Sequence, residues 1–361
     1  MSTDPYKQLA ERLDAMPNGF PATDDGAELR LLQALYSPDE ALLASQLRIT
    51  KETVDEIGQR TGEDPAALRK QLKGLARRGL IAAGMTTEGE LGFGLLPFVV
   101  GIYEMQIGVI DETLAELFEN YYQKAFGQML SISPAVHRVI PVNESVRMNL
   151  EVQPFESAVE IIAGAKSWGV LDCICRKQKA LIGEPCRHPV DVCMALSSKP
   201  NAFDRNPVIK GVTQEEAMGT LQRAASAGLV HSVSNNQEGL GYICNCCTCS
   251  CGILRGMSDL GIANVVARSA FVNTVDETVC TGCELCIDSC QFDALSLTEE
   301  FFIHVNESRC VGCGVCVPNC IEDALALVKR PDEELKPIPV TEADWAKERA
   351  FTRGLDLQSI M

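Results

Sequence analysis

The chain has 361 residues, 46% of them hydrophobic, and a formal net charge of −17, so it can form two or three domains with hydrophobic cores. The acidic balance disfavours nucleic acid and anionic membranes as partners over most of the surface and favours a basic protein partner. Seventeen cysteines exceed what cores require, and the N-terminal segment has no secretory pattern. We therefore expect a cytoplasmic protein whose reduced thiols bind metal or act in catalysis.

Residues 1–92 predict a winged-helix-like domain. The segment TKETVDEIGQRTG predicts a helix with Thr50 as its N-cap, and DPAALRKQLKGLARRGLI a second one with Asp64 as N-cap and Pro65 at the first helical position. The glycine-rich stretch AAGMTTEGELGFG would form the wing. The second helix has an apolar stripe made of Leu68, Leu72, Leu75 and Leu80.

The same helix carries basic residues where a winged-helix regulator would contact DNA. They are Arg69, Lys70, Lys73, Arg77 and Arg78. However, the predicted wing lacks lysine and arginine, and residues 26–90 contain nine basic against ten acidic residues. We therefore expect a protein-docking module, with DNA binding as the alternative.

Two apolar segments follow. The run LGFGLLPFVVGIY at 91–103 is too short to span a bilayer, so we expect no transmembrane segment. Residues 111–130 have the spacing of an amphipathic helix, whose aromatic stripe suits a core or a partner face. The stripe is formed by Leu114, Leu117, Phe118, Tyr121, Tyr122 and Phe126.

Residues 93–272 predict a cysteine-rich α+β domain. The segment GVLDCIC alternates like a strand, and LVHSV–SNNQEG–LGYIC is typical of a β-hairpin with a polar turn. Between them, residues 213–228 predict a helix with a capping box, Thr213 with Glu216, that ends at Gly228. The nine cysteines of the domain are Cys173, Cys175, Cys186, Cys193, Cys244, Cys246, Cys247, Cys249 and Cys251.

Alternation along a strand predicts which of these thiols share a face. Two pairs with the same spacing, Cys173 with Cys175 and Cys244 with Cys246, would complete one four-thiol site. A second site would combine Cys186 and Cys193 with two of Cys247, Cys249 and Cys251. One or two [4Fe–4S] clusters are the favoured occupants; zinc, or free buried thiols, are the alternatives. His188 is a candidate ligand or an ordinary surface residue.

The C-terminal part contains an internal repeat. CTGCELCIDSCQFDALSL at 280–297 and CVGCGVCVPNCIEDALAL at 310–327 both contain C-x2-C-x2-C-x3-C. This pattern resembles the bacterial two-cluster ferredoxin over residues 273–330. Zinc, which also binds C-x2-C pairs, usually takes two pairs rather than one evenly spaced run.

The resemblance implies two [4Fe–4S] clusters with exchanged fourth ligands. One would be held by Cys280, Cys283, Cys286 and Cys320, and the other by Cys310, Cys313, Cys316 and Cys290. Glycines at 282, 312 and 314 would let the backbone pass close to the sulfides. The family's proline after the fourth cysteine is Gln291 in the first copy and Ile321 in the second, which would alter hydrogen bonding near the clusters.

A second resemblance covers most of residues 90–330. The segments RVIPVNES, VQPFESAVEIIAGAKSWGVLDCICR and ICNCCTCSCGILRG look like a widespread group of 4Fe–4S proteins of anaerobes that end in a ferredoxin domain. Ser250 occupies a position that is often cysteine there, so that position is not expected to be an essential ligand. The resemblance supports electron transfer and names no substrate.

These observations predict an iron–sulfur electron-transfer protein, a subunit or partner of a larger anaerobic oxidoreductase, with a redox partner that has a basic docking face. The ferredoxin-like segment has ten acidic and three basic residues. No Walker loop, dinucleotide fingerprint or catalytic triad is found, and no catalytic residue is predicted. The alternatives are an iron–sulfur redox-sensing transcription regulator and a reductase acting at an open central cluster. Residues 331–361 predict an extended tail.

Overall fold

The computed structural model describes residues 4–142, 145, 152–262 and 265–361. The segment RVIPVNES therefore lies partly outside the described residues. The chain forms two compact units. Unit 1 consists of residues 1–132, 178–184 and 346–361, and unit 2 of residues 133–177 and 185–345. This division is coarser than the predicted domains 1–92, 93–272, 273–330 and 331–361, which stay a prediction.

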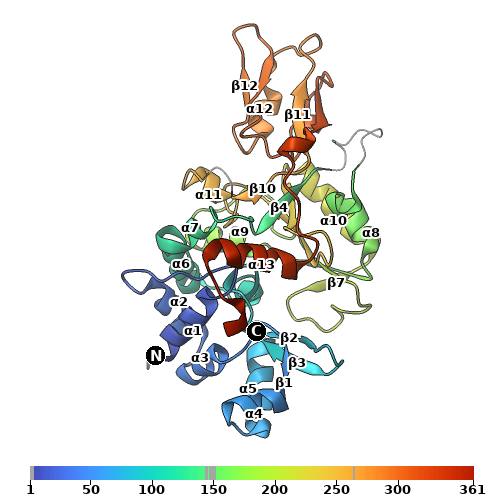
Figure 1. Ribbon diagram of the computed structural model, residues 1–361. Helices are drawn as coiled ribbons and strands as arrows, with labels where there is room; N and C mark the ends of the chain where they lie inside the picture. Colours follow the sequence, from blue (N-terminus) through green and yellow to red (C-terminus); the bar gives the residue numbers. More distant parts are fainter. Residues whose placement is uncertain (1–3, 143–144, 146–151, 263–264) are drawn as a thin grey trace. The chain divides into compact units, whose positions relative to one another are not determined.

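Unit 1 begins with helices and a small antiparallel sheet of order β1-β3-β2 (Figure 1). The helices are α1 (Pro5–Asp14), α2 (Ala27–Leu35), α3 (Pro38–Ser45), α4 (Val54–Thr61) and α5 (Pro65–Arg77). The strands are β1 (Glu52–Thr53), β2 (Ala82–Met85) and β3 (Leu91–Gly94). The helices α4 and α5 and the β2–β3 hairpin lie where the sequence predicts them; the winged-helix assignment itself stays a prediction.

The predicted cap of α4 is wrong, whereas that of α5 is confirmed. Helix α4 begins one turn later than expected, because Thr53 and Glu56 form a reciprocal capping box and Thr50 lies outside the helix. Helix α5 has Asp64 as its N-cap, with Pro65 directly after it. Its leucine stripe is buried and its basic side chains are exposed.

The aromatic stripe after residue 110 belongs to the core of unit 1. The predicted single helix consists of α6 (Glu112–Tyr121), a π-helical turn η3 (Tyr122–Phe126) and α7 (Gly127–Met129). Phe118 stacks on Tyr103 with ring centroids 3.7 Å apart. The short turns before it are η1 (Phe98–Ile102) and η2 (Glu104–Gly108).

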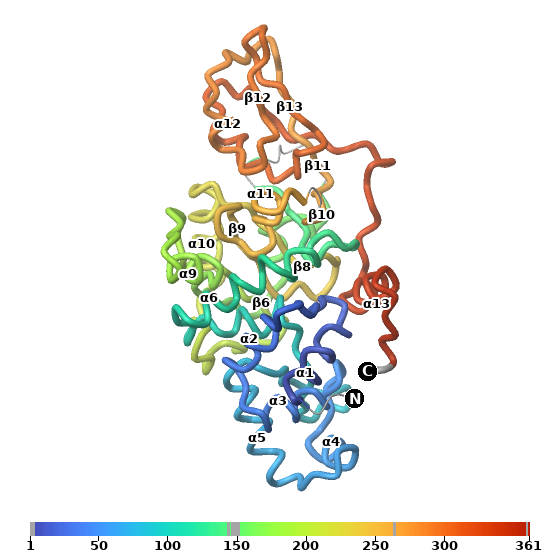
Figure 2. Tube along the Cα trace, turned by 90° about the vertical axis from the view of Figure 1, so that its left-hand side faces the viewer, coloured from blue at the N-terminus to red at the C-terminus, as the bar shows by residue number. Residues whose placement is uncertain are grey.

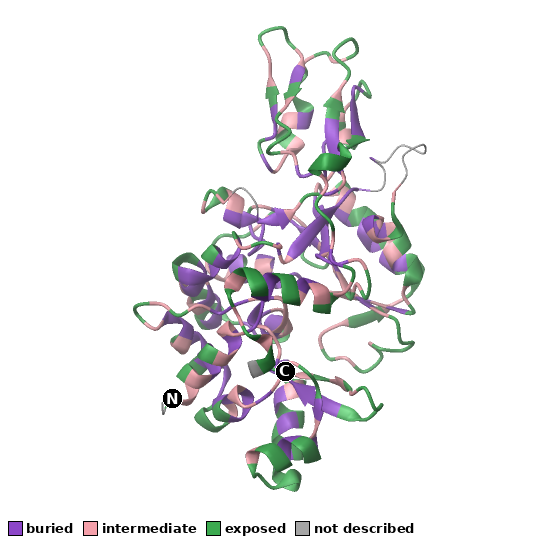
Figure 3. Ribbon diagram, viewed as in Figure 1, coloured by how far each residue is buried: buried purple, intermediate pink, exposed green. Residues whose placement is uncertain are grey.

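Unit 2 contains a seven-stranded sheet of order β10-β4-β8-β9-β6-β5-β7, in which the β10–β4 pair is parallel and the other pairs are antiparallel. The strands are β4 (His137–Ile140), β5 (Ser167–Leu171), β6 (Cys193–Ser197), β7 (Lys210–Val212), β8 (Val230–Ser234), β9 (Tyr242–Cys246) and β10 (Val266–Ala267). Strand β4 is buried along its length (Figure 3).

Helices α8 (Ala158–Gly164) and α10 (Gln214–Ser226) pack on this sheet through Ile162, Ala217 and Leu221, which share one core cluster with Ile243 of β9. The capping box of α10 is confirmed, as is the hairpin, in which β8 and β9 are antiparallel neighbours. The remaining short helices are η5 (Pro154–Glu156), α9 (Ile174–Leu181), whose residues from Gln178 onwards are assigned to unit 1, and α11 (Arg255–Ser258).

The repeat segment forms two short antiparallel ladders within unit 2, β11 with β14 and β12 with β13. Their bounds are β11 (Phe271–Val275), β12 (Leu295–Leu297), β13 (Ile303–Val305) and β14 (Leu325–Lys329). Each repeat also places a short helix inside its cysteine run: α12 (Leu285–Ser289) in the first and η6 (Val317–Asn319) in the second. Helix α12 lies beside β12 (Figure 2).

The predicted extended tail is wrong for twelve of its residues. Glu342–Arg353 forms α13, preceded by η7 (Asp332–Glu334) and followed by η8 (Leu357–Ser359). Arg349 of α13 is buried and donates to the carbonyls of Pro17 and Met129 within unit 1. No helix among the described residues is long and apolar enough to cross a membrane.

Replacing Leu72 by alanine should lower the free energy of unfolding of unit 1 by about 2–5 kcal/mol, because its fully buried side chain would leave a cavity. The adjacent Lys73 is exposed, so Lys73→Ala should change that energy by less than about 0.5 kcal/mol. Urea titration followed by circular dichroism measures both. Equal denaturation midpoints for the two variants would contradict the orientation of α5.

Candidate metal centres

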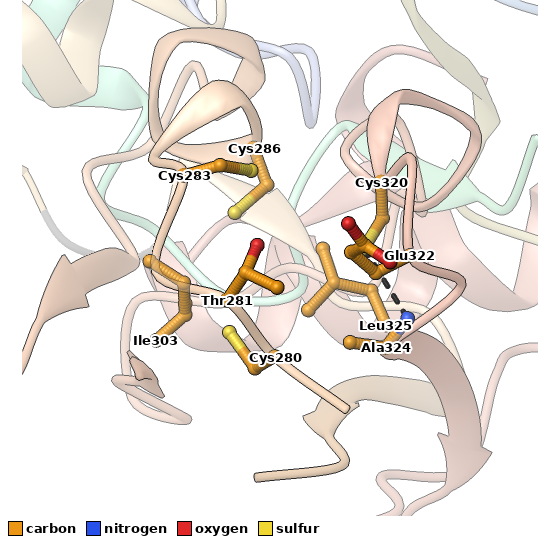
Figure 4. Close-up of a pocket in the computed structure, with 9 residues that line it drawn as sticks. All are labelled: Cys280, Thr281, Cys283, Cys286, Ile303, Cys320, Glu322, Ala324 and Leu325. Carbon is orange, nitrogen blue, oxygen red and sulfur yellow. Dashed lines mark hydrogen bonds between the residues drawn. The ribbon is translucent and has the colours of Figure 1, made fainter. Parts of the chain in front are cut away.

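The first ferredoxin set, Cys280, Cys283, Cys286 and Cys320, surrounds one hollow (Figure 4). Two of its thiols come from the loop before α12, one comes from α12 itself, and Cys320 comes from the other repeat. The backbone N–H of Ala324 donates to Sγ of Cys320 over 3.3 Å. The structure thus brings together the four residues that the resemblance implies for one cluster.

The second ferredoxin set, Cys310, Cys313, Cys316 and Cys290, is gathered in the same reciprocal way. Burial, and after it the nearby Cys290 and Cys310, raises the pKa of the Cys313 thiol to about 12. Burial, followed by the thiols of its own set, also raises the pKa of Cys316. The thiol of Cys286, which belongs to the first set, adds to this increase. The two sets are therefore close enough to interact electrostatically. Such a set disfavours thiolates unless a cation compensates their charge.

Glycine is required in these loops by close backbone contacts, whereas the expected approach of the loops to cluster sulfides stays a prediction. Gly282 and Gly312 both have positive φ angles, of 68° and 71°. A Cβ atom at either position would collide with a backbone carbonyl, that of Phe301 at Gly282 and that of Phe271 at Gly312. The glycines therefore let each cysteine loop pack closely against a neighbouring strand or turn.

Six of the nine central cysteines form a closed ring of neighbouring thiols, the six-thiol ring. Hydrogen bonds from Cys175 and Cys193 hold the pKa of Cys173 well below its usual range. On the opposite side, a hydrogen bond from Cys244, supported by one from Cys251, lowers the pKa of Cys246 to about 6. The ring is closed by contacts of Cys175 with Cys251 and of Cys193 with Cys244.

The local structure that builds the ring differs from the predicted strand. Strand β5 ends at Leu171 and α9 begins at Ile174, so Cys173 precedes the helix and Cys175 lies in its first turn. Their predicted shared strand face is therefore wrong. The two thiols still meet, because the chain turns tightly where the helix begins.

The predicted second site is wrong for Cys193, which belongs to the ring. Strand β6 pairs with β9 so that Met194 lies opposite Ile243, and continuing this register places Cys193 opposite Cys244. Strand β9 ends at Cys246, and the turn after it reverses direction, with the amide of Cys251 bonded to the carbonyl of Cys247. This turn returns Cys251 to the ring, so the expected strand alternation does not extend beyond Cys246.

The compact site consists of Cys186, His188, Cys247 and Cys249. All four donor atoms lie within 4.8 Å of one another. Sγ of Cys186 is 3.7 Å from Sγ of Cys247 and 3.1 Å from that of Cys249. A hydrogen bond from Cys249, with a further one from His188, lowers the pKa of Cys247 to about 3 against the effect of burial. The neighbouring Ser250 is buried and lies outside the set.

Arg176 interacts electrostatically with thiols of both the ring and the compact site, and it is a residue that the cysteine pattern alone does not single out. It is 1% exposed and donates to the carbonyls of Pro189 and Asn245. Burial lowers the pKa of its guanidinium, but the thiolates of Cys173 and Cys247 outweigh this and raise it above the usual value. The sequence does contain a signal for this role, because Arg176 directly follows C-x-C and a cation is thereby placed beside crowded thiols.

Gln291 explains one departure from the ferredoxin pattern. Gln291 stands where the family has proline. Its side-chain oxygen accepts a hydrogen bond of 2.8 Å from the backbone N–H of Thr248, and its side-chain amide nitrogen donates to the carbonyl of Gly228. Thr248 lies between Cys247 and Cys249, and Gln291 directly follows Cys290. One side chain thus ties the second ferredoxin set to the compact site.

A buried polar row leads from strand β4 to the ring. Nδ1 of His137 lies 3.3 Å from the hydroxyl of Ser232, which lies 3.7 Å from Sγ of Cys246. His231 of β8 contacts the side chain of Asn245 on β9 at 2.5 Å. No sequence motif marks these residues; they meet because β4, β8 and β9 are neighbours in the sheet.

Comparison with known protein families identifies the repeat. The profile of the 4Fe-4S dicluster domain matches residues 279–324. No curated protein and no solved structure matches the chain significantly. The chain therefore contains an iron–sulfur domain, and the central cysteines lie outside the matched range.

Acid should destabilise unit 2 through His137. Burial lowers its pKa from about 6.5 to about 4, so the stabilisation from the neutral ring is complete above about pH 6.5 and lost as the pH falls towards 4. This amounts to on the order of 3 kcal/mol. His137→Phe, which keeps the packing on Tyr242, should therefore lose less stability between pH 7 and pH 5 than the wild type.

The midpoints of urea unfolding at several pH values measure this difference. The pH range is limited to values at which the visible absorption of the iron–sulfur clusters is constant, so that cluster loss does not contribute. His231 has the same direction of pKa shift, again through burial, and keeps part of the slope in the variant. The exposed His304 offers a matched control, and His304→Phe should leave the wild-type slope unchanged. If the stability of His137→Phe depended on pH as steeply as that of the wild type, His137 would not be a source of the acid destabilisation.

Proposed function

We propose that the protein relays single electrons through iron–sulfur clusters, as a subunit or dedicated partner of a larger oxidoreductase. The observation that carries this proposal is the exchange of the fourth thiol between the repeats: Cys320 joins the first set and Cys290 the second. This is the arrangement of a two-cluster ferredoxin. Bound clusters would supply reversible one-electron chemistry at each set.

The residues around the two sets suit electron transfer. Cys286 and Cys316, one from each set, are both buried and belong to one core cluster, so the two sets adjoin. The side-chain amide of Asn273 donates to Sγ of Cys316 over 3.3 Å. A donor to a ligand sulfur favours added negative charge, and Asn273 therefore favours the reduced state at the second set.

The six-thiol ring fits a further polynuclear iron–sulfur site. Six thiols are more than one cube needs as ligands, and the buried guanidinium of Arg176 compensates part of their charge. The donors are sulfur only, which suits iron–sulfur clusters among first-row metal sites. We therefore assign the third redox centre of the chain to this ring.

The first ferredoxin set is the proposed contact point for the redox partner. Cys283 is exposed, and four exposed apolar residues lie near the set: Val279, Leu285, Phe301 and Ile321. Acidic residues surround them in the sequence, among them Glu299 and Glu300, both exposed. Exposed apolar side chains within an acidic surface fit a partner that has a basic rim around an apolar centre.

Iron analysis tests the assignment of the redox centres. The anaerobically reconstituted protein should bind about 8 iron atoms in the ferredoxin sets and about 4 or more in the ring. Cys173→Ser combined with Cys193→Ser and Cys244→Ser leaves three thiols in the ring, fewer than the four that one cube takes, and should remove only the second portion. The electron paramagnetic resonance of the reduced ferredoxin clusters should persist. Ser250→Ala is the control and should keep all the iron.

Two results would contradict these assignments. An iron content of about 8 that the triple variant leaves unchanged would exclude iron from the ring. A Cys280→Ser, Cys310→Ser variant that keeps the full iron content would exclude the ferredoxin sets as cluster sites.

Ionic strength should control association with a basic acceptor. Reduction of cytochrome c, used as a basic model acceptor, should slow as salt rises, mainly through the association rate. Glu299→Gln combined with Glu300→Gln should lower the rate at low salt, whereas Asp39→Asn with Asp55→Asn, which changes exposed acids of unit 1, should not. A rate independent of salt would rule out electrostatic docking.

A further inference from the structure

The compact site differs in size from the other cysteine sets. Among the cysteine, histidine and carboxylate side chains of the described residues, these four could together hold a metal ion, because their donor atoms all lie within 4.8 Å of one another. The ferredoxin sets and the six-thiol ring are wider and do not meet this condition. The space at the centre of the compact site is therefore smaller than at the sets assigned to clusters.

The distances come close to those around a single tetrahedral ion. Zinc bound at about 2.3 Å by sulfur and about 2.0 Å by nitrogen requires sulfur–sulfur edges of about 3.8 Å and sulfur–nitrogen edges of about 3.5 Å. The observed sulfur–sulfur distances from Cys186 are 3.7 and 3.1 Å. Nδ1 of His188 lies 3.0 Å from Sγ of Cys186 and 3.8 Å from that of Cys249.

A cube does not fit between these atoms. In a [4Fe–4S] cluster, irons and sulfides lie between the ligand sulfurs, so four ligand atoms cannot all lie within 4.8 Å of one another as they do here. To hold a cube, the chain segments that carry Cys186 and Cys249 would have to separate. Thr248, between the two cysteines of the turn, is held by Gln291, which opposes such a movement.

We propose that the compact site binds one zinc ion through Cys186, His188, Cys247 and Cys249. Three thiolates and one imidazole form a common structural zinc set, with no open position for substrate. Each half of the site is a short chelate, C-x-H in one segment and C-x-C in the other. The amide of His188 also donates to Sγ of Cys186 over 3.4 Å.

The charges around the site also suit a zinc ion. Three thiolates and Zn²⁺ leave one net negative charge, and the guanidinium of Arg176 lies close enough to Cys247 to offset it. Zinc has no redox chemistry, so this ion would not carry electrons. Its role would be to fix the turn 247–249, which Gln291 ties to the second ferredoxin set. This inference is independent of the proposed electron path.

Metal analysis of the full-length protein tests the inference. Protein purified anaerobically from cells supplied with iron and zinc should contain about one zinc per chain. The extended X-ray absorption fine structure at the zinc edge should show about three sulfur ligands at about 2.3 Å and one nitrogen at about 2.0 Å. After dialysis against a chelator, His188→Ala and Cys249→Ser should each keep less than roughly a fifth of the zinc, with the iron content unchanged. His304→Ala is the matched control and should keep both metals.

Three results would overturn it. One is a loss of about four iron atoms in His188→Ala, which would place a cluster at the compact site. Another is a single bound iron without zinc in the wild type. The third is a metal-free site with a Cys186–Cys249 disulfide, seen by mass spectrometry of the untreated protein. The spectrum of the wild type decides the question even if a variant fails to fold.

Discussion

Charge compensation is the constraint on which unit 2 depends. Its seventeen thiols lie in four sets, and several are buried where an isolated thiolate is unstable. The guanidinium of Arg176 interacts electrostatically with both central sets, through Cys173 in the ring and Cys247 in the compact site. Elsewhere, burial raises the pKa of thiols such as Cys313 and Cys316, so metal cations are needed to hold the ligand form. Metal binding and folding of this unit are therefore expected to be coupled.

The sequence predicts those parts of the site that depend on local periodicity or on a repeat. The exchange between Cys290 and Cys320 follows from the repeated spacing and the ferredoxin resemblance, and the β8–β9 hairpin follows from alternation around a polar turn. The caps at Asp64 and Thr213 are predictable for the same reason, because a cap is a local contact. Thr53 has Glu56 three residues later, which is the spacing of a capping box, whereas Thr50 has Thr53 and Val54 at the corresponding positions; the sequence therefore already contains the signal that selects Thr53.

The rest depends on contacts between distant segments. Sequence alternation does not place Cys193 and Cys251 in the ring, because the pairing of β6 with β9 decides the neighbour of the first and a turn after Cys247 decides that of the second. Gln291 stands out in the sequence only as a missing proline. Its bonds to Thr248 and Gly228 join segments more than forty residues away in sequence, which no local pattern encodes. Arg176, in contrast, has a local signal in its position directly after two cysteines.

The crowding of five cysteines in residues 244–251 follows from one change of direction. Cys244 and Cys246 lie two residues apart on β9, so both thiols face the six-thiol ring. The chain leaves the strand at Cys247, whose thiol joins the compact site, and the turn that follows adds Cys249 to that site before it returns Cys251 to the ring. A single ribbon thus supplies three thiols to a wide set and two to a narrow one. Because the sets differ in width, the same segment can hold a polynuclear centre on one side and a single ion on the other, and Gln291 connects that segment to the ferredoxin repeat.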